Sequence, residues 1–128
     1  MGGLACAMLL LAAGGVGASA GERWAGVSSG GTEDCSALSF HLMIADGLIG
    51  GYASSDGSRS GTRRQWTVTG SVAPGREVVL TVETTDARIR VGRQSTRWTG
   101  KMDGATLTLE QVKSIGCTPP RRATLSRQ

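Results

Sequence analysis

Histidine and the motifs of nucleophilic catalysis are nearly absent from this 128-residue sequence. The single histidine, His41, alternates with Phe40, Leu42 and Ile44, so that a strand would place it on the face opposite the apolar residues. No Gly-x-Ser-x-Gly motif accompanies it. The carboxylates lie mainly in expected turns or on outward strand faces, where no pair stands out as a general acid and base: Asp34, Asp46, Asp56, Glu77, Glu83, Asp86, Asp103 and Glu110. We therefore predict that the protein is not an enzyme.

Metal ligands, phosphate-binding loops and aromatic residues are also scarce. With one histidine, only carboxylates remain as ligands, and they do not follow the spacing of a calcium loop. The glycine-rich stretches are not placed between a strand and a helix, where such loops cradle phosphate. Aromatic residues make up 4% of the chain, too few for a base-stacking surface. We predict no metal, no cofactor and no nucleic-acid partner.

Charge is missing from the first 21 residues, because the first charged side chain is Glu22. The apolar run 4–16 is followed at 18–20 by Ala-Ser-Ala, the small-x-small pattern of a signal peptidase site. A membrane-spanning helix needs about 20 apolar residues, so this run is too short for an anchor, and the context of Cys6 matches a lipoprotein signal poorly. A buried N-terminal helix is the remaining alternative. The sequence predicts a signal peptide at 1–20, a single domain at 21–128 without a transmembrane segment, and a periplasmic or secreted location.

Cysteine is rare as well, and loss of Cys6 with the leader would leave only Cys35 and Cys117. An even pair in an exported chain predicts a disulfide bond. Closing so long a loop would stabilise the fold by about 4 to 5 kcal/mol in the chain-entropy view.

Short alternating segments dominate the rest of the chain, and no helical periodicity appears after residue 20. The clearest is 39–45, followed by the Asp46-Gly47 turn signal and a returning strand at 48–52, whereas 53–62 reads as an exposed loop. Further strands are expected around these apolar residues: Trp24, Trp66, Val68, Val72, Val78, Leu80, Val82, Ile89, Val91, Trp98, Leu107, Leu109 and 123–125. We predict an all-β fold, a small antiparallel up-and-down β-barrel of about eight strands in a meander, with a β-sandwich as the alternative.

Glycine recurs two positions after an apolar residue in three of these segments, at Gly26, Gly70 and Gly100. Each glycine would share the face of its apolar neighbour and leave room for a bulky side chain or a sharp bend.

Cations gather in the segment 88–101. If Ile89, Val91 and Trp98 point inward, then Arg88, Arg90, Arg97 and Lys101 point outward together. Neighbouring like charges destabilise a sheet unless something offsets them, so this surface is a candidate anion-binding face. Four more arginines extend it in this reading: Arg63, Arg64, Arg121 and Arg122. The alternative is a solvated strand surface whose long side chains cover apolar area.

Two segments resemble strands of avidin-like barrels, members of the calycin-like small β-barrels. Segment 48–54, Leu-Ile-Gly-Gly-Tyr-Ala-Ser, is similar to their Leu-x-Gly-x-Tyr-x-Ser strand, and 96–100, Thr-Arg-Trp-Thr-Gly, to their Thr-x-Trp-x-Gly strand. The resemblance implies a barrel in which Tyr52, Ser54 and Trp98 line a ligand pocket.

The chain departs from that family at Gly26, where the family has an Asn, and no late Trp or Asp completes a biotin cage. Biotin is therefore not the expected ligand. The layout of cysteines, turns and x-Gly strands also looks like small exported bacterial β proteins of unassigned function, which implies an exported setting and no mechanism.

The function favoured by these observations is a non-enzymatic binding or interaction module that meets an anionic or apolar ligand or an envelope protein. A structural envelope-associated protein is one alternative. A periplasmic inhibitor of an enzyme such as lysozyme is another, although a net charge of +4 would repel a basic enzyme. A wide barrel pocket would favour a small ligand, and a filled interior a macromolecular partner.

Overall fold

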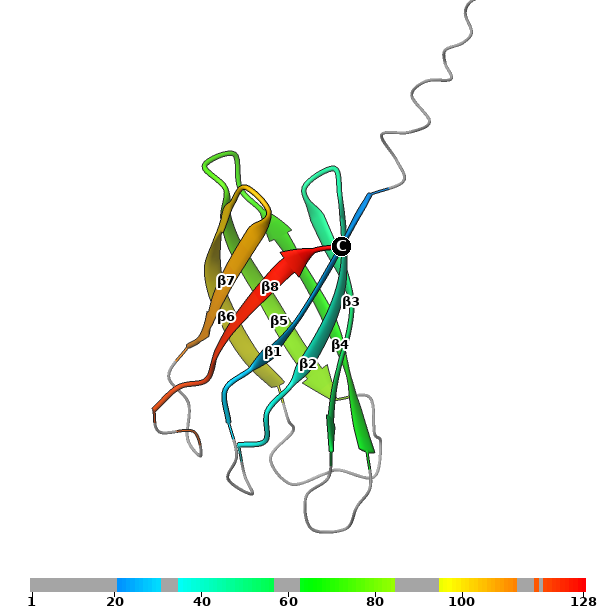
Figure 1. The fold of residues 1–128 in the computed structure, drawn as a ribbon, viewed down its shortest axis with the longest axis vertical. Helices are drawn as coiled ribbons and strands as arrows, with labels where there is room; N and C mark the ends of the chain where they lie inside the picture. Colours follow the sequence, from blue (N-terminus) through cyan, green and yellow to red (C-terminus); the bar gives the residue numbers. More distant parts are fainter. Residues whose placement is uncertain (1–20, 31–34, 57–62, 85–94, 113–116, 118) are drawn as a thin grey trace, which may run out of the picture.

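The protein is an eight-stranded antiparallel barrel in which each strand pairs with its neighbours in the chain and β8 closes against β1 (Figure 1). This computed structural model describes residues 21–30, 35–56, 63–84, 95–112, 117 and 119–128. The strands are β1 (Glu22–Ser28), β2 (Ser39–Ala45), β3 (Leu48–Asp56), β4 (Arg63–Val72), β5 (Glu77–Thr84), β6 (Ser95–Asp103), β7 (Thr106–Gln111) and β8 (Arg122–Arg127). The all-β barrel predicted from the sequence is confirmed, because closure leaves no second sheet of the kind that a sandwich requires.

The core consists of the inward side chains of all eight strands. Alternation along β2 is complete, since Phe40, Leu42 and Ile44 are buried while His41 and Met43 are exposed. Trp24 and Trp98 are the largest fully buried side chains, and the rings of Phe40 and Trp98 meet edge to face at 5.2 Å. Each such side chain contributes roughly 1.5 to 3 kcal/mol by leaving water. The tryptophans thus belong to the hydrophobic core.

The hairpin between β2 and β3 has the turn chemistry that its sequence predicts. Asp46 and Gly47 both have positive φ, 52° and 78°, as a two-residue type I′ turn requires. Strand β3, however, continues to Asp56, so the prediction of an exposed loop from residue 53 was wrong for 53–56. Small side chains conceal this stretch in the sequence, yet Ala53 is fully buried and pairs with Phe40 on β2 and Trp66 on β4. The strand expected at Ile89 and Val91 lies outside the described residues.

Glycines allow neighbouring strands to approach closely at four points of the barrel, namely Gly26, Gly51, Gly70 and Gly100. A Cβ atom at Gly26, Gly70 or Gly100 would overlap the backbone carbonyl oxygen of the adjacent strand, respectively that of Thr124, Val79 and Thr108. The space expected after each apolar residue is therefore occupied by backbone, and each glycine permits a sharp bend of the sheet.

The two ends of the barrel differ. Short turns at 46–47, 73–76 and 104–105 lie at one end with Gln128, the turn end, shown uppermost in Figure 1. The opposite ends of the strands, where the connections 29–38, 57–62, 85–94 and 112–121 begin and end, form the other end of the barrel, the loop end. Cys35 and Cys117 form a disulfide that joins the first and last of these connections, with Cα atoms 5.4 Å apart. Among the described residues no helix is long and apolar enough to cross a bilayer.

Candidate functional site

Tyr52 and Ser54 are separated from Trp98 by the barrel wall. Ile49, Ala53 and Ser55 of β3 point inward and are buried, so alternation turns Tyr52 and Ser54 outward. Tyr52 is 42% exposed and stacks on the ring of His41, with centroids 4.8 Å apart, whereas Trp98 is fully buried inside. The resemblance to avidin-like barrels led us to expect these residues in one pocket. The register of β3 places them on opposite sides of the sheet.

The expected basic face is described only in part. Arg97 and Lys101 point outward from β6 as predicted, while Arg88 and Arg90 lie outside the described residues. Lys101 stands directly opposite Glu77 of β5, and Arg97 opposite Thr81. Of the two cations of this face that the structure describes, Lys101 therefore has a carboxylate, that of Glu77, directly beside it.

A shallow open groove of about 740 Å³ crosses the outside of β5 to β8. Lys101 and Glu77 line it, and so do Glu110 and Arg122, which form an ion pair at 3.4 Å. Because its cations and carboxylates are equal in number, the groove does not select an anionic ligand.

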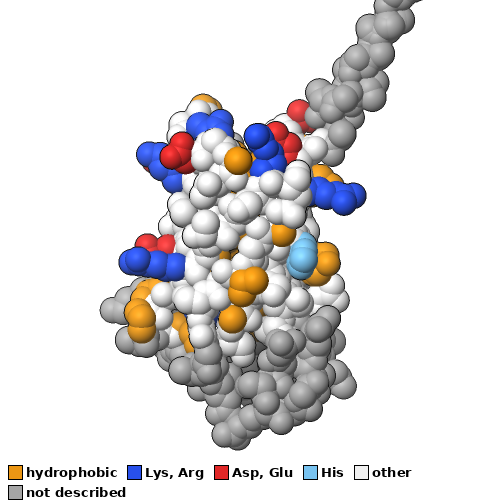
Figure 2. All heavy atoms as spheres, viewed as in Figure 1, with side chains coloured by type: hydrophobic (Ala, Val, Ile, Leu, Met, Phe, Trp, Pro, Cys, Tyr) orange, Lys and Arg blue, Asp and Glu red, His pale blue; other side chains and the backbone are white. Residues whose placement is uncertain are grey.

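The outward positions of β2, β3 and β4 whose side chains the structure describes hold no Asp, Glu, Lys or Arg, and we call this surface the uncharged wall. Its outward positions are Ser39, His41, Met43, Ala45, Leu48, Gly50, Tyr52, Ser54, Gln65, Thr67, Thr69 and Ser71. Three of these side chains are apolar or aromatic and well exposed: Met43 (40%), Leu48 (67%) and Tyr52 (42%). Figure 2 shows the histidine beside hydrophobic side chains on this side of the barrel.

The opposite side of the barrel carries charged side chains of both signs. Its outward charged side chains, on β5 to β8, are Glu77, Glu83, Arg97, Lys101, Asp103, Glu110 and Arg122. Both signs are interspersed there, as solubility favours. The absence of charge is thus confined to one sector of the wall, and strand order brings that sector together.

Among the described residues, the polar side chains that are buried or half-buried in the interior lie near the loop end, where they form a polar layer. Its members are Ser28, Ser55, Thr96, Gln111 and Arg121. The Ser28 hydroxyl accepts a hydrogen bond from the backbone N–H of Leu38 at 2.9 Å. The Thr96 hydroxyl accepts one from Nε1 of Trp98, also at 2.9 Å. These bonds satisfy buried polar groups that would otherwise destabilise the folded protein.

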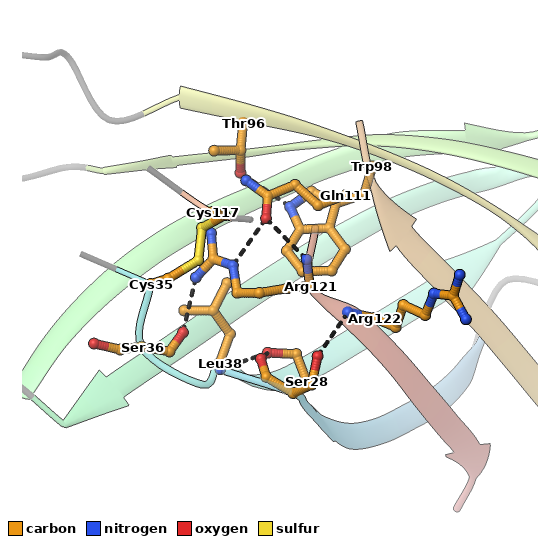
Figure 3. Close-up of a disulfide and its surroundings, with 11 residues drawn as sticks. Ser28, Cys35, Ser36, Leu38, Thr96, Trp98, Gln111, Cys117, Arg121 and Arg122 are labelled. Atoms are coloured by element: carbon orange, nitrogen blue, oxygen red, sulfur yellow. Dashed lines mark hydrogen bonds between the residues drawn. A yellow bond between two sulfur atoms is a disulfide. The ribbon is translucent and has the colours of Figure 1, made fainter. Parts of the chain in front are cut away.

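Arg121 is the charged member of the polar layer and is only 9% exposed (Figure 3). Its Nε donates to Oε1 of Gln111 at 3.0 Å, and Nη1 donates to the backbone oxygen of Ser36 at 2.8 Å. The guanidinium carbon lies 5.4 Å from the ring centroid of Trp98, within the range of a cation–π interaction. Burial lowers the pKa of Arg121, because desolvation disfavours its charged form.

The sequence reasoning misassigned Arg121 to the outer basic face. The next residue, Arg122, does face outward and pairs with Glu110, but Arg121 points inward with Ala123 and Leu125. The alternation Arg121, Ala123, Leu125 was the signal that could have revealed this. Two prolines at 119–120 hide it, because they interrupt the strand pattern directly before the arginine.

Metal ligands do not cluster in the part of the chain that the structure describes, where no group of three His, Cys, Asp or Glu side chains could hold an ion. Comparisons of this chain with protein-family models, with curated proteins and with solved structures found no match.

Proposed function

We propose that this chain is a non-enzymatic interaction module of an oxidising, exported compartment, and that it binds a macromolecular partner through the uncharged wall. The observation that carries the proposal is that the outward positions of the uncharged wall, from Ser39 on β2 to Ser71 on β4, hold no Asp, Glu, Lys or Arg as far as the structure describes their side chains. The disulfide between Cys35 and Cys117 supports the compartment. The packed core, with Trp24, Phe40 and Trp98 fully buried, favours a partner outside the barrel over a ligand within it.

A partner that covers only the outward positions of this wall would bury no described charged side chain, although Arg23 of β1 and Glu83 of β5 lie at its two borders. Burying an unpaired charge costs several kcal/mol, and the centres of protein interfaces are accordingly depleted of charged residues and enriched in Tyr and Met. The exposed side chains of Met43, Leu48 and Tyr52 would instead gain free energy by leaving water. Hydroxyl groups of Thr67, Thr69 and other wall residues would supply hydrogen bonds.

The ring pair of His41 and Tyr52 gives the wall a preorganised centre. The two residues lie directly opposite each other on β2 and β3, and their rings are nearly parallel, with an angle of 21°. A rigid aromatic anchor loses little conformational entropy on binding, so more of its contact energy appears as affinity.

A photo-crosslinking residue introduced at Tyr52 in the producing cell tests this proposal. We expect one adduct of discrete mass. We expect this adduct to disappear when Met43, which lies on β2 two residues beyond the partner of Tyr52, is replaced by Lys. Thr108 is the matched control, because it is an exposed outward position on β7, away from the wall. Equal adducts from both positions would favour a structural envelope protein without a specific face, and no adduct from Tyr52 would contradict the proposal.

A further inference from the structure

The guanidinium of Arg121 keeps unused hydrogen-bond donors at the loop end. Arginine has five N–H groups, and here one is accepted by Gln111 and one by Ser36. No acceptor in the described chain takes the others. They are not sealed off, since Nε1 of Trp24 is the only side-chain nitrogen or oxygen of the described residues that is both fully enclosed and without a partner. The unpaired edge of this guanidinium is therefore not fully enclosed by the described residues.

The neighbouring groups also offer donors. The hydroxyl oxygen of Thr96 already accepts the indole N–H of Trp98, which leaves the hydroxyl proton available for donation. Trp98 connects the two residues, because its N–H meets Thr96 and its ring lies beneath Arg121. Donors without a matching acceptor are complementary to an anion.

The positive charge of Arg121 has no carboxylate partner among the described residues. The carboxylates of the described strands β5, β6 and β7 point outward, as Glu77, Glu83, Asp103 and Glu110 do, and Glu22 and Asp46 are exposed toward the turn end. Burial lowers the pKa of Arg121, so desolvation already disfavours its charged form. A bound anion would compensate the desolvated cation and stabilise the fold.

The planar shape of the Arg121 guanidinium favours a carboxylate as the ligand. A carboxylate presents two coplanar oxygens that match a guanidinium edge. The ring of Trp98 and the Cys35–Cys117 disulfide form apolar surroundings beside the charge (Figure 3).

We propose that Arg121, with the Thr96 hydroxyl and over the Trp98 ring, forms a binding site for the carboxylate of a small organic acid or of a peptide chain terminus. The site lies in the mouth of the barrel at the loop end. It is independent of the uncharged wall, and neither proposal needs the other.

Titration of the purified, oxidised protein with sodium benzoate, at ionic strength held constant with sodium chloride, tests the site. We expect a saturable rise in melting temperature and a saturable change in tryptophan fluorescence, because Trp98 lies against the site. Arg121→Gln removes the charge and is expected to weaken binding about tenfold or more. Arg122→Gln is the matched control, since that neighbouring arginine is exposed and paired outside with Glu110, and it should bind like the parent protein.

A short peptide with a free C-terminus, compared with the same peptide amidated, separates the two sources of the carboxylate. A response to the free peptide and not to benzoate assigns the site to chain termini, and the reverse assigns it to small acids. If Arg121→Gln does not fold, the fluorescence titration of the parent protein decides. Responses to both benzoate and the free peptide that are no greater than the response to chloride, or an equal loss in both arginine variants, would overturn the proposal.

Discussion

At the scale of single residues, two buried tryptophans occupy similar environments with different hydrogen bonding. Trp24 and Trp98 are both almost wholly buried in the core. The indole N–H of Trp98 donates to Thr96, whereas that of Trp24 has no acceptor. An unsatisfied buried donor costs about 1 to 3 kcal/mol, so Trp24 stabilises the barrel through its ring and destabilises it through its N–H.

Replacing each tryptophan by phenylalanine should separate these effects. Both variants lose indole volume, but Trp24→Phe also removes the unsatisfied donor, while Trp98→Phe removes a satisfied one and the contact with Arg121. We expect Trp98→Phe to lower the free energy of unfolding by about 1 to 2 kcal/mol more than Trp24→Phe does, as measured by urea titration. Equal losses would indicate that an enclosed water satisfies Trp24.

At the scale of elements, the strand glycines of the barrel differ in how closely the neighbouring strand approaches them. Gly100 on β6 faces the carbonyl oxygen of Thr108 on β7, whereas the Cα of Gly50 on β3 has open space beside it. Both glycines lie within strands, and neither has positive φ. The comparison therefore isolates steric overlap from backbone conformation.

We expect Gly100→Ala to destabilise the protein by more than about 2 kcal/mol, because β6 and β7 must separate to admit the new methyl group. Gly50→Ala is the control, and we expect no loss or a gain of about 0.4 to 1 kcal/mol from reduced freedom of the unfolded chain. Urea unfolding of the two variants measures both effects. Similar losses in both would show that strand glycines matter here for a reason other than close approach.

At the scale of the whole molecule, the disulfide joins two connections at the loop end that are far apart in sequence. Cys35 and Cys117 are separated by 82 positions, and the bond crosses from the β1–β2 connection to the β7–β8 connection. It thereby fixes Ser36 beside Arg121, whose Nη1 donates to the Ser36 carbonyl. The covalent bond and the polar layer support each other.

Removal of this disulfide by Cys35→Ser with Cys117→Ser should lower the free energy of unfolding by about 4 to 5 kcal/mol in the chain-entropy view. Chemical denaturation of the oxidised parent protein and of the double variant measures the difference. Addition of a thiol reductant to the parent should reproduce the loss and leave the variant unchanged. A parent protein equally stable with and without reductant would contradict the expectation.

Local chemistry in the sequence was sufficient for most of the fold. Alternation predicted strand β2 with its observed ends, and the Asp46-Gly47 pair predicted the turn that follows. These features depend on neighbours in the chain, whose spacing the sequence displays directly. Local chemistry was insufficient at 53–56, where residues without apolar alternation are held in a strand by their partners on β2 and β4.

Only the tertiary structure decided what the strands bring together. Arg121 reaches Ser36 across 85 positions of chain because β8 closes against β1, and no local pattern encodes that meeting. The uncharged wall likewise arises from the lateral order of three strands, and the register of β3 decides that Tyr52 joins it while Trp98 lies inside. The sequence by itself determined the strands and the cysteine pair, because periodicity and composition are local. Barrel closure determined the candidate sites, because their members are distant in the chain.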